Sequence, residues 1–329
     1  MNEERPLVSI CMPVFNAERW IGAALESALG QTYTELELVV ADNASTDATV
    51  EIARSLADPR LTIETATRTI GAVANHNRAI RLSRGAFVKL LHADDLLFPT
   101  CVEEMVALAL EDARIGLVFA PREVLLEEVS DPGWAERFAR PHESFESLQR
   151  ITEGRELFRQ LLAAGFEGNW IGEPSAVLLR RAALERVGLF NERLFQIADV
   201  ELWARIAYAH RLGFVDRMLS VYRHHEQSGT AQNARVRRDW FDQVWLLEGL
   251  LTLPDLVPED RRELRRLRRA AVLRALRTQA GRILQRRWTP ELAAYLAFRT
   301  GSALGKRPRL YDELDEQESA EAQRLPARG

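Results

Sequence analysis

The feature that most limits how this chain can fold is an alternation of short apolar runs and helix-period segments between Leu7 and Pro121. Apolar runs predict strands, and the segments between them, with apolar residues three and four positions apart, predict helices. Strands joined through helices form right-handed crossovers and a mainly parallel sheet, so we expect an α/β fold. The predicted strands are Leu7–Val14, Leu36–Ala41, Leu61–Thr65, Ala86–Leu91 and Gly116–Ala120; the predicted helices are Ala17–Leu29, Thr46–Leu56, Ala72–Ser83 and Pro99–Glu111.

The alternation changes after Pro121. Residues 122–150 carry mixed charges and two Pro-containing breaks, which fits either a lid-like insertion or a plain surface loop. Thr152 is the expected cap of the next helix. Beyond residue 150 the predicted helices are Thr152–Ala164, Arg181–Val187 and Asp199–His210, and the predicted strands are Ser175–Leu179 and Phe214–Tyr222.

From about Gln232 to Leu304 the sequence is helical in pattern, and residues 261–287 are crowded with arginine. Two interpretations remain open. The arginines can form an amphipathic surface on anionic lipid, or their stems can cover apolar surface in a solvated helical bundle. The scarcity of aromatic residues favours the bundle. The polar tail at 306–329 is expected to be frayed or disordered.

Composition excludes several classes of protein. The 329 residues have a formal net charge of -4 and a pI near 6.0, which argues against a dedicated nucleic-acid binder. Cys11 and Cys101 are expected to be buried small hydrophobes rather than a disulfide pair. With no secretory signal pattern and no apolar stretch of about 20 residues, we expect a cytoplasmic location. The oligomeric state stays open.

Polar residues follow three of the predicted strands. The first strand leads into Phe15 and Asn16, the second into Asp42 and the residues up to Asp47, and the fourth into His92-Ala93-Asp94-Asp95. Ligands of such sheets collect at the carboxyl ends of the strands. Two adjacent carboxylates there suit a divalent cation that holds a diphosphate, although they can also mark a solvated turn before a helix.

Two further segments near this edge allow more than one interpretation. Asp42 can accept hydrogen bonds from a base or ribose, while Ser45 and Thr46 are also good helix caps. Gly71 permits close backbone approach to a nucleotide or simply makes a turn. Asn75, Asn77 and Arg78 follow it, as ligand contacts or as ordinary helical residues.

Several runs together, in this order and spacing, carry a family resemblance. They are Val8–Asn16, Ala41–Asp47, Gly71–Ala79, Gly85–Asp95, Glu173–Ala176, Arg180–Glu192, Asp199–Trp203 and Tyr222–His225. The chain thereby resembles the family 2 glycosyltransferases, which have the GT-A nucleotide-sugar fold, a Rossmann-like and mainly parallel sheet flanked by helices. The resemblance implies a glycosyltransferase domain at 1–226, a C-terminal helical region at 227–305 and a tail at 306–329. Within the domain, it implies a nucleotide-sugar half at 1–121, an insertion at 122–150 and an acceptor and catalytic half at 151–226.

The resemblance also implies roles for individual residues. A divalent cation, Mn²⁺ or Mg²⁺, would be bound by Asp94, Asp95 and His225, with His224 as the competitor of His225. His92 stands where the common pattern has a leading acid. An imidazole that coordinates the cation would favour manganese over magnesium, and the alternative is that His92 contacts only the ribose. The residues implied in nucleotide-sugar binding are Pro13, Phe15, Asn16, Asp42, Ser45, Asp47, Gly71, Asn75, Asn77, His92, Ala93, Asp94 and Arg223.

Asp199 matches the position of the catalytic base in inverting members. A carboxylate there can take the proton of the acceptor hydroxyl, whereas the simpler alternative is an acid favoured by the helix dipole. Trp170 and Glu173 are the acceptor-side candidates, and Trp203 is expected to pack in the core.

The resemblance implies a transferase that moves sugar from a nucleoside-diphosphate sugar to a glycan or lipid-linked hydroxyl in cell-surface polysaccharide synthesis. The alternative is a non-catalytic nucleotide-sugar-binding or scaffold protein of the same fold. A nicotinamide-dependent oxidoreductase is set aside, because Pro13-Val14-Phe15-Asn16-Ala17 is not a glycine-rich turn. Contact with the inner face of a membrane would come through the arginine-rich helices.

Overall fold

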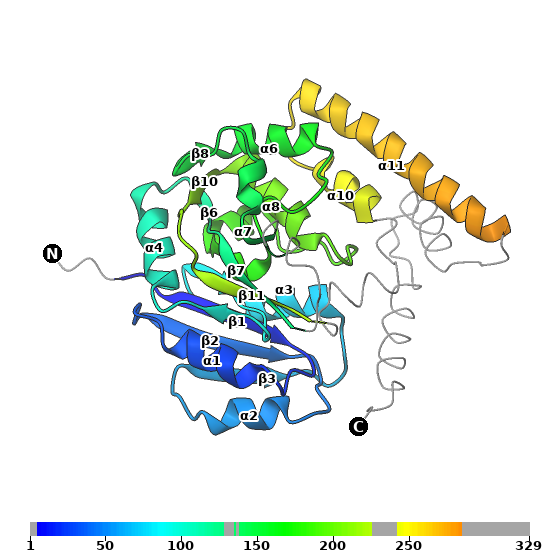
Figure 1. The fold of residues 1–329 in the computed structure, drawn as a ribbon. Coiled ribbons are helices and arrows are strands. Elements are labelled where there is room, and N and C mark those ends of the chain that lie inside the picture. Colours follow the sequence, from blue (N-terminus) through cyan, green and yellow to red (C-terminus); the bar gives the residue numbers. More distant parts are fainter. Residues whose placement is uncertain (1–4, 128–134, 136–137, 226–241, 285–329) are drawn as a thin grey trace.

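The computed structural model describes residues 5–127, 135, 138–225 and 242–284. Its main feature is an eight-stranded sheet of order β3-β2-β1-β4-β9-β6-β10-β8, in which only β9 and β8 run against the other strands. Helices lie on both faces of this sheet (Figure 1). The architecture is therefore the predicted α/β fold with a mainly parallel sheet.

The strands of the large sheet are short and mostly buried. They are β1 Val8–Val14, β2 Leu36–Asp42, β3 Leu61–Thr65, β4 Phe87–Leu90, β6 Ile115–Phe119, β8 Ile151–Glu153, β9 Val177–Arg180 and β10 Arg211–Phe214. The helices, including two short 3₁₀ turns η1 and η2, are α1 Ile21–Leu29, α2 Thr49–Ser55, α3 Ala72–Leu82, α4 Cys101–Glu111, η1 Pro141–Ser144, α6 Gly154–Ala163, η2 Pro174–Ala176, α7 Arg181–Val187, α8 Ala198–Ala209, α10 Asp242–Leu250 and α11 Pro258–Leu284.

Two apolar cores lie on opposite faces of the sheet, and β1 supplies side chains to both. Ile10 and Met12 pack on one face with residues of α1 and α4, while Cys11 between them packs on the other face with α3, α6 and α8. Successive side chains of a strand point to opposite faces, so a strand covered on both sides is apolar throughout. This explains why β1 carries an unbroken apolar run instead of an alternating one.

A small second sheet, β5-β11-β7, contributes to the functional region. Its strands are β5 Leu96–Leu97, β7 Arg122–Leu126 and β11 Ser220–His224. β11 pairs antiparallel with β5 and parallel with β7. The pairing brings the end of β11 beside the acidic segment that precedes β5, although the two are far apart in sequence.

Three sequence predictions are wrong in their details. The stretch predicted as one strand, Phe214–Tyr222, is divided by a turn between β10 and β11, which belong to different sheets. Thr152 lies in β8 and does not cap α6, because its hydroxyl exchanges hydrogen bonds with the backbone of Gln149. The expected insertion at 122–150 begins with β7, a paired strand, so neither a lid nor a loop describes its first residues.

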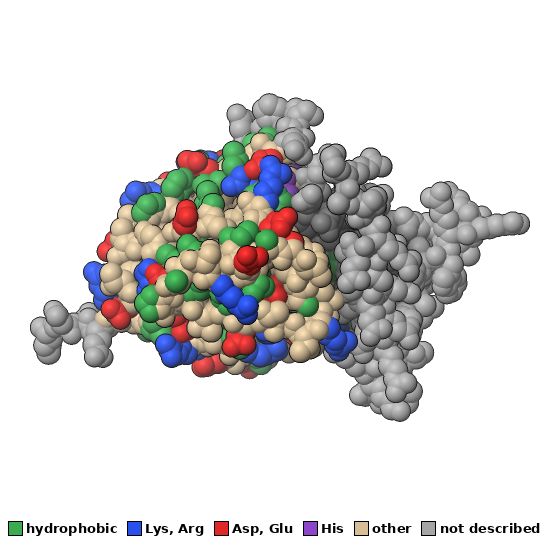
Figure 2. Space-filling model, turned by 90° about the horizontal axis from the view of Figure 1, so that it is seen from below, with side chains coloured by type: hydrophobic (Ala, Val, Ile, Leu, Met, Phe, Trp, Pro, Cys, Tyr) green, Lys and Arg blue, Asp and Glu red, His purple; other side chains and the backbone are tan. Residues whose placement is uncertain are grey.

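The C-terminal region forms α10 and α11, and α11 extends along one side of the molecule (Figure 1). The rest of the predicted helical region, and the predicted tail, lie outside the described residues. None of the described helices is long and apolar enough to cross a bilayer. On the face drawn in Figure 2, acidic and basic side chains of the described residues are interspersed.

We predict that Gly154→Ala destabilises the fold. A Cβ at Gly154 would lie 2.0 Å from the carbonyl oxygen of His210 and 2.2 Å from that of Ala207, so the backbone of α6 or α8 must move. Overpacking of this kind costs about 1–3 kcal/mol, measurable by urea unfolding. Gly22→Ala is the matched control, because its Cβ would meet only Ile52 at 3.7 Å. Equal stability of the two variants would contradict the prediction.

Candidate active site

The carboxyl ends of β1 and β2 form one corner of the site. Asn16 has a positive φ of 49°, and its side-chain oxygen accepts the N–H of Thr46 at 2.9 Å. The N–H of Asn16 is bound by the hydroxyl of Ser45 at 2.9 Å. The carboxylate of buried Asp42 accepts the N–H of Ser45 at 3.2 and 3.3 Å. Neither Ser45 nor Thr46 caps α2, which has no side-chain cap, so both residues instead fix the two loops against each other.

The remaining residues predicted near this corner divide into two groups. Phe15 exposes 39% of its surface, and Pro13 is half-buried beside it on β1. Asp47 is held inward, where it accepts the N–H groups of Glu18 at 3.1 Å and Thr49 at 3.1 Å. The exposed ring of Phe15 is therefore the accessible apolar surface of this corner.

Gly71 is the N-cap of helix α3, and its φ of 85° favours glycine. The amide of Asn75 donates to the carbonyl of Ala41 at 2.7 Å, which ties the helix to the end of β2. Asn77 is buried, and its amide donates to Phe190 and Glu192 at 2.9 Å and accepts from the Phe190 N–H at 2.9 Å. The protein itself thus uses the polar atoms of Asn77, and its role as a nucleotide contact stays a prediction.

The acidic segment connects β4 to β5. Asp95 is fully buried, and both of its oxygens are occupied: one accepts the hydroxyl of Ser175 at 2.6 Å and the other accepts the N–H of Arg223 at 2.9 Å. The same Ser175 hydroxyl binds the N–H of His92 at 3.0 Å. Burial, together with the charge of Asp94, raises the pKa of Asp95. Asp95 thus connects three distant segments of the chain.

Asp94 is more open than Asp95, with 26% of its side chain exposed. His225 donates from Nε2 to Asp94 at 3.1 Å, and its ring stacks on Trp20 with centroids 4.1 Å apart. Although burial works in the other direction, the bond from His225 and the nearby His92 lower the pKa of Asp94. Arg223 donates to the carbonyl of Asp94 at 2.9 Å, which fixes the backbone.

A divalent cation fits this group. His92, Asp94 and Asp95 can place one ligand atom each within 4.8 Å of one another. The His92 side chain is 28% exposed, so it and Asp94 are both reachable from solvent. Burial lowers the pKa of His92, and burial lowers that of the adjoining His76 to about 3, so burial favours the neutral form of each ring. A neutral imidazole and a carboxylate are both ordinary metal ligands.

Asp199 lies at the start of α8, as predicted for either interpretation of this residue. One oxygen accepts the N–H of Val200 at 2.8 Å and the other accepts the amide of Asn169 at 2.7 Å. Burial raises the pKa of Asp199 to about 7, the Val200 N–H opposes the rise, and the negative charge of Glu173 adds to it. A carboxylate with a pKa near neutrality is suited to accept a proton at neutral pH.

Asn169 and Arg122 are functional-region residues that the sequence interpretation missed. Asn169 also holds the backbone of Gly172 with two hydrogen bonds of 2.9 Å, and Gly172 has a φ of 119°. The guanidinium of Arg122 is fully buried and pairs with Glu173. In the sequence, an Asn and glycines in a turn are only a weak indication of a functional site. Arg122 and Asp199 both lie far from this turn along the chain. Only the fold brings these residues to Asp199.

The two predicted tryptophans differ in environment. Trp203 is buried, and its Nε1 donates to the Gly172 carbonyl at 3.0 Å, so the expectation of core packing agrees with its burial. Trp170 is half-buried and packs edge-on against Phe145. Its acceptor role stays a prediction.

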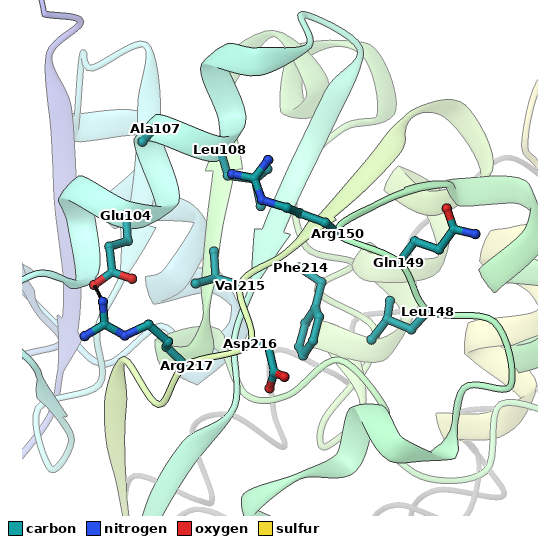
Figure 3. Close-up of a pocket in the computed structure, with 10 residues that line it drawn as sticks. All are labelled: Glu104, Ala107, Leu108, Leu148, Gln149, Arg150, Phe214, Val215, Asp216 and Arg217. Atoms are coloured by element: carbon teal, nitrogen blue, oxygen red, sulfur yellow. Dashed lines mark ion pairs between the residues drawn. The ribbon is translucent and has the colours of Figure 1, made fainter.

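A pocket of about 530 Å³ lies apart from all of these residues (Figure 3). It is bordered by the side of α4, the chain at 148–150 and the turn after β10, with a Glu104–Arg217 ion pair at one end (Figure 3). None of the predicted site residues lines it. The strand-end region, where the titratable groups converge, is therefore the candidate active site.

Comparison with known proteins decides the family. Residues 9–188, more than half of the chain, match the model of a family described as Glycosyl transferase family 2. The chain belongs to glycosyltransferase family 2. This family 2 glycosyltransferase is 33% identical over 254 residues to the uncharacterised protein MT1568 of Mycobacterium tuberculosis, over 77% of this chain and 78% of that protein.

A shorter match names an activity for another protein. Over 119 residues, 36% of this chain and 47% of the relative, the glycosyltransferase is 33% identical to Escherichia coli UDP-Glc:alpha-D-GlcNAc-diphosphoundecaprenol beta-1,3-glucosyltransferase WfgD. It thus spans less than half of that relative.

Solved structures share the GT-A fold. Staphylococcus aureus TarS in complex with UDP-GlcNAc has a TM-score of 0.62 at 19% identity, over 82% of this chain and 72% of that one. The mannosyltransferase PcManGT of Pyrobaculum calidifontis, in complex with GDP-Man and Mn²⁺, has a TM-score of 0.55 at 22% identity, over 96% and 85% of the two chains. At these identities the likeness establishes the fold.

We predict that Ser175→Ala destabilises the glycosyltransferase, because the hydroxyl joins the buried Asp95 carboxylate to the His92 backbone. Leaving such groups without a partner costs about 1–3 kcal/mol, measured by urea unfolding at pH 7. Ser55→Ala is the control, since the exposed Ser55 hydroxyl bonds only to a carbonyl of its own helix. A loss in Ser175→Ala no larger than in the control would count against the bridging role.

Proposed function

We propose that this glycosyltransferase transfers a sugar from a nucleoside-diphosphate sugar to a hydroxyl of a glycan or lipid-linked acceptor, with inversion at the anomeric carbon, in cell-surface polysaccharide synthesis. The observation that carries the proposal is the position of Asp199. The negative charge of Glu173 acts on Asp199 and also on His92 and Asp95, so the base and the acidic group belong to one electrostatic environment.

The donor would bind across the strand ends. Phe15 offers an exposed ring to the base, and Asp42 lies behind the loop that Ser45 and Asn16 hold together. The diphosphate would reach the segment that leads from His92 to Asp95, beside Arg223 and His225. Cationic and imidazole side chains near a diphosphate suit its negative charge.

The reaction needs a base on the opposite face of the sugar. As the acceptor oxygen bonds to the anomeric carbon, the carboxylate of Asp199 would take its proton, and the bond to the nucleoside diphosphate would break. Asn169 holds the carboxylate in place through its amide at 2.7 Å. Asp94, with His92 or His225 beside it, would hold a divalent cation, which when bound offsets charge on the departing diphosphate. Trp170 follows Asn169 in the sequence, and Glu173 follows Gly172, whose backbone Asn169 holds. Both side chains would contact the acceptor.

Asp199→Asn is expected to lower transfer by about 100- to 10,000-fold, the range of general base catalysis, and to leave donor binding nearly unchanged. A panel of nucleotide sugars with Mn²⁺ or Mg²⁺, read by mass spectrometry for transfer or hydrolysis, identifies the donor and measures the loss. Glu259→Gln, an exposed acid in the first turn of α11, is the matched control. Wild-type rates in Asp199→Asn would remove the residue from this role, and donor binding without any turnover would support the non-catalytic alternative.

The pH dependence of transfer follows from the same carboxylate. Because Asp199 must lose its proton and its pKa is about 7, kcat/KM is expected to rise with pH through about 7. The Asn169 amide stabilises the charged form of Asp199. Asn169→Ala is therefore expected to raise the pKa of Asp199 and to move the rise of kcat/KM to higher pH by roughly one unit. An unchanged pH dependence of kcat/KM in Asn169→Ala would show that Asn169 does not act on the base.

We also propose that the outer face of α11 rests on anionic lipid. Leu264, Ala271 and Ala275 are buried on the inner side of the helix. Residues three, four and seven positions apart share a helix face, and the opposite face carries exposed side chains. They are Arg262, Arg265, Arg266, Arg269, Leu273, Leu276 and Arg277. Basic residues followed by exposed leucines fit a negatively charged bilayer surface.

Replacement of Arg262, Arg265 and Arg269 by Gln is expected to weaken vesicle binding by about 1 kcal/mol for each arginine. Co-sedimentation with phosphatidylglycerol-containing vesicles measures the loss, and pure phosphatidylcholine vesicles are expected to bind little of either protein. A variant with Arg54, Arg81 and Arg84 replaced by Gln has the same net charge and tests for non-specific attraction. Equal loss in both variants would refute a specific role of α11.

A further inference from the structure

Two imidazole rings meet beside the acidic segment. Nε2 of His76 on α3 lies 2.9 Å from Nε2 of His92, and the rings are perpendicular with centroids 5.1 Å apart. At this distance one nitrogen carries a hydrogen and the other accepts it. The second ring nitrogen of His76, Nδ1, lies 2.8 Å from the carbonyl oxygen of Ala72. A carbonyl can only accept, so Nδ1 of His76 carries a hydrogen.

These contacts determine which nitrogen of His92 is free. A neutral imidazole carries one hydrogen, and on neutral His76 that hydrogen is the one on Nδ1 that the Ala72 carbonyl accepts. The His76 ring also packs edge-on against Phe190, with centroids 5.5 Å apart. His76 therefore accepts at Nε2, and His92 donates from its own Nε2. Nδ1 of neutral His92 then has a lone pair and no hydrogen.

That lone pair faces the acids. Nδ1 of His92 lies 3.7 Å from Oδ2 of Asp95, which is too long for a hydrogen bond. His92, Asp94 and Asp95 can each place one ligand atom within 4.8 Å of the other two. Lone pairs that converge without a hydrogen between them suit a cation. A nitrogen ligand favours manganese and related metals, whereas magnesium prefers oxygen ligands.

We propose that His76 is a positioning residue that holds His92 in the Nε2–H tautomer, so that Nδ1 of His92 is a nitrogen ligand of the divalent cation and selects Mn²⁺ over Mg²⁺. The inference rests on the proposed donor site for its metal, while the tautomer is a property of the metal-free protein. Hydrogen bonds to the other nitrogen of a ligating histidine commonly set its tautomer in this way.

The tautomer is tested without metal or substrate. Long-range ¹H–¹⁵N correlation spectra of protein labelled at histidine nitrogen distinguish the two tautomers, and His76→Gln and His92→Asn assign the signals. We expect His92 as Nε2–H in the wild type and in His76→Gln, whose side-chain oxygen can still accept. In His76→Phe, which lacks an acceptor, we expect a mixture. A wild-type His92 in the Nδ1–H form, or one indifferent to His76→Phe, overturns the proposal.

Metal selection is tested by direct binding of Mn²⁺, followed by electron paramagnetic resonance, and by its competition with Mg²⁺, with UDP or GDP present. We expect His76→Phe to lose about 10- to 100-fold in Mn²⁺ affinity with little change for Mg²⁺. His76→Gln is expected to retain wild-type affinity, and His92→Asp to favour Mg²⁺. His210→Gln, at a half-buried histidine that packs near Gly116, is the control.

Two results separate this inference from the proposed function. Equal losses of Mn²⁺ and Mg²⁺ in His76→Phe, or no loss of either, reject the ligand role of His92, as does a wild type that binds no Mn²⁺. None of these metal-binding results bears on glycosyl transfer, which the assay of Asp199→Asn tests separately. Conversely, a protein that binds Mn²⁺ through His92 but transfers no sugar would reject the proposed function alone.

Discussion

The buried carboxylate of Asp95 is the interaction on which the site depends. It accepts the hydroxyl of Ser175 at 2.6 Å and the N–H of Arg223 at 2.9 Å, from segments 80 and 128 residues away. A buried carboxylate is tolerated only where hydrogen bonds replace water. These bonds come from the turn before β9 and from β11. The acidic segment therefore reaches its final conformation only when both elements are packed against it. Asp94 is left at the surface of a backbone that cannot easily shift.

Asp95 and Asp94 therefore have different functions despite being adjacent. Each oxygen of Asp95 accepts a hydrogen bond from the protein and so organises it, while Asp94 and His92 keep part of their side chains exposed to solvent. The base is held by the same means, since Asn169 and the Val200 N–H fix Asp199 while burial brings its pKa to about 7. Reactive groups that are rigidly held spend little entropy on reaching a productive geometry.

The sequence predicted the alternating part of the fold well, because apolar periodicity reports which faces are covered. β3 and α7 begin and end at the predicted residues, and the ends of β1, β2 and β4 were located to within about a residue. It could not predict the small sheet, since β5 has two residues and β7 pairs with a strand almost 100 positions later. Nor could it identify Ser175, Asn169 or His76 as partners of the site. Their importance comes from contacts made only after folding, whereas Asp94 and Asp199 lie in local patterns that stand out alone.

The placement of β9 also affects how the chain is made. β9 lies between β4 and β6 and pairs with both, so it joins two strands that lie well before it in the sequence. During synthesis, the edges of β4 and β6 that pair with β9 would stay unpaired until residues 177–180 leave the ribosome. A nascent chain that paused earlier would expose bare strand edges, which readily pair with other chains. The strand that completes the sheet is thus also the one whose delay leaves the unfinished protein most exposed to aggregation.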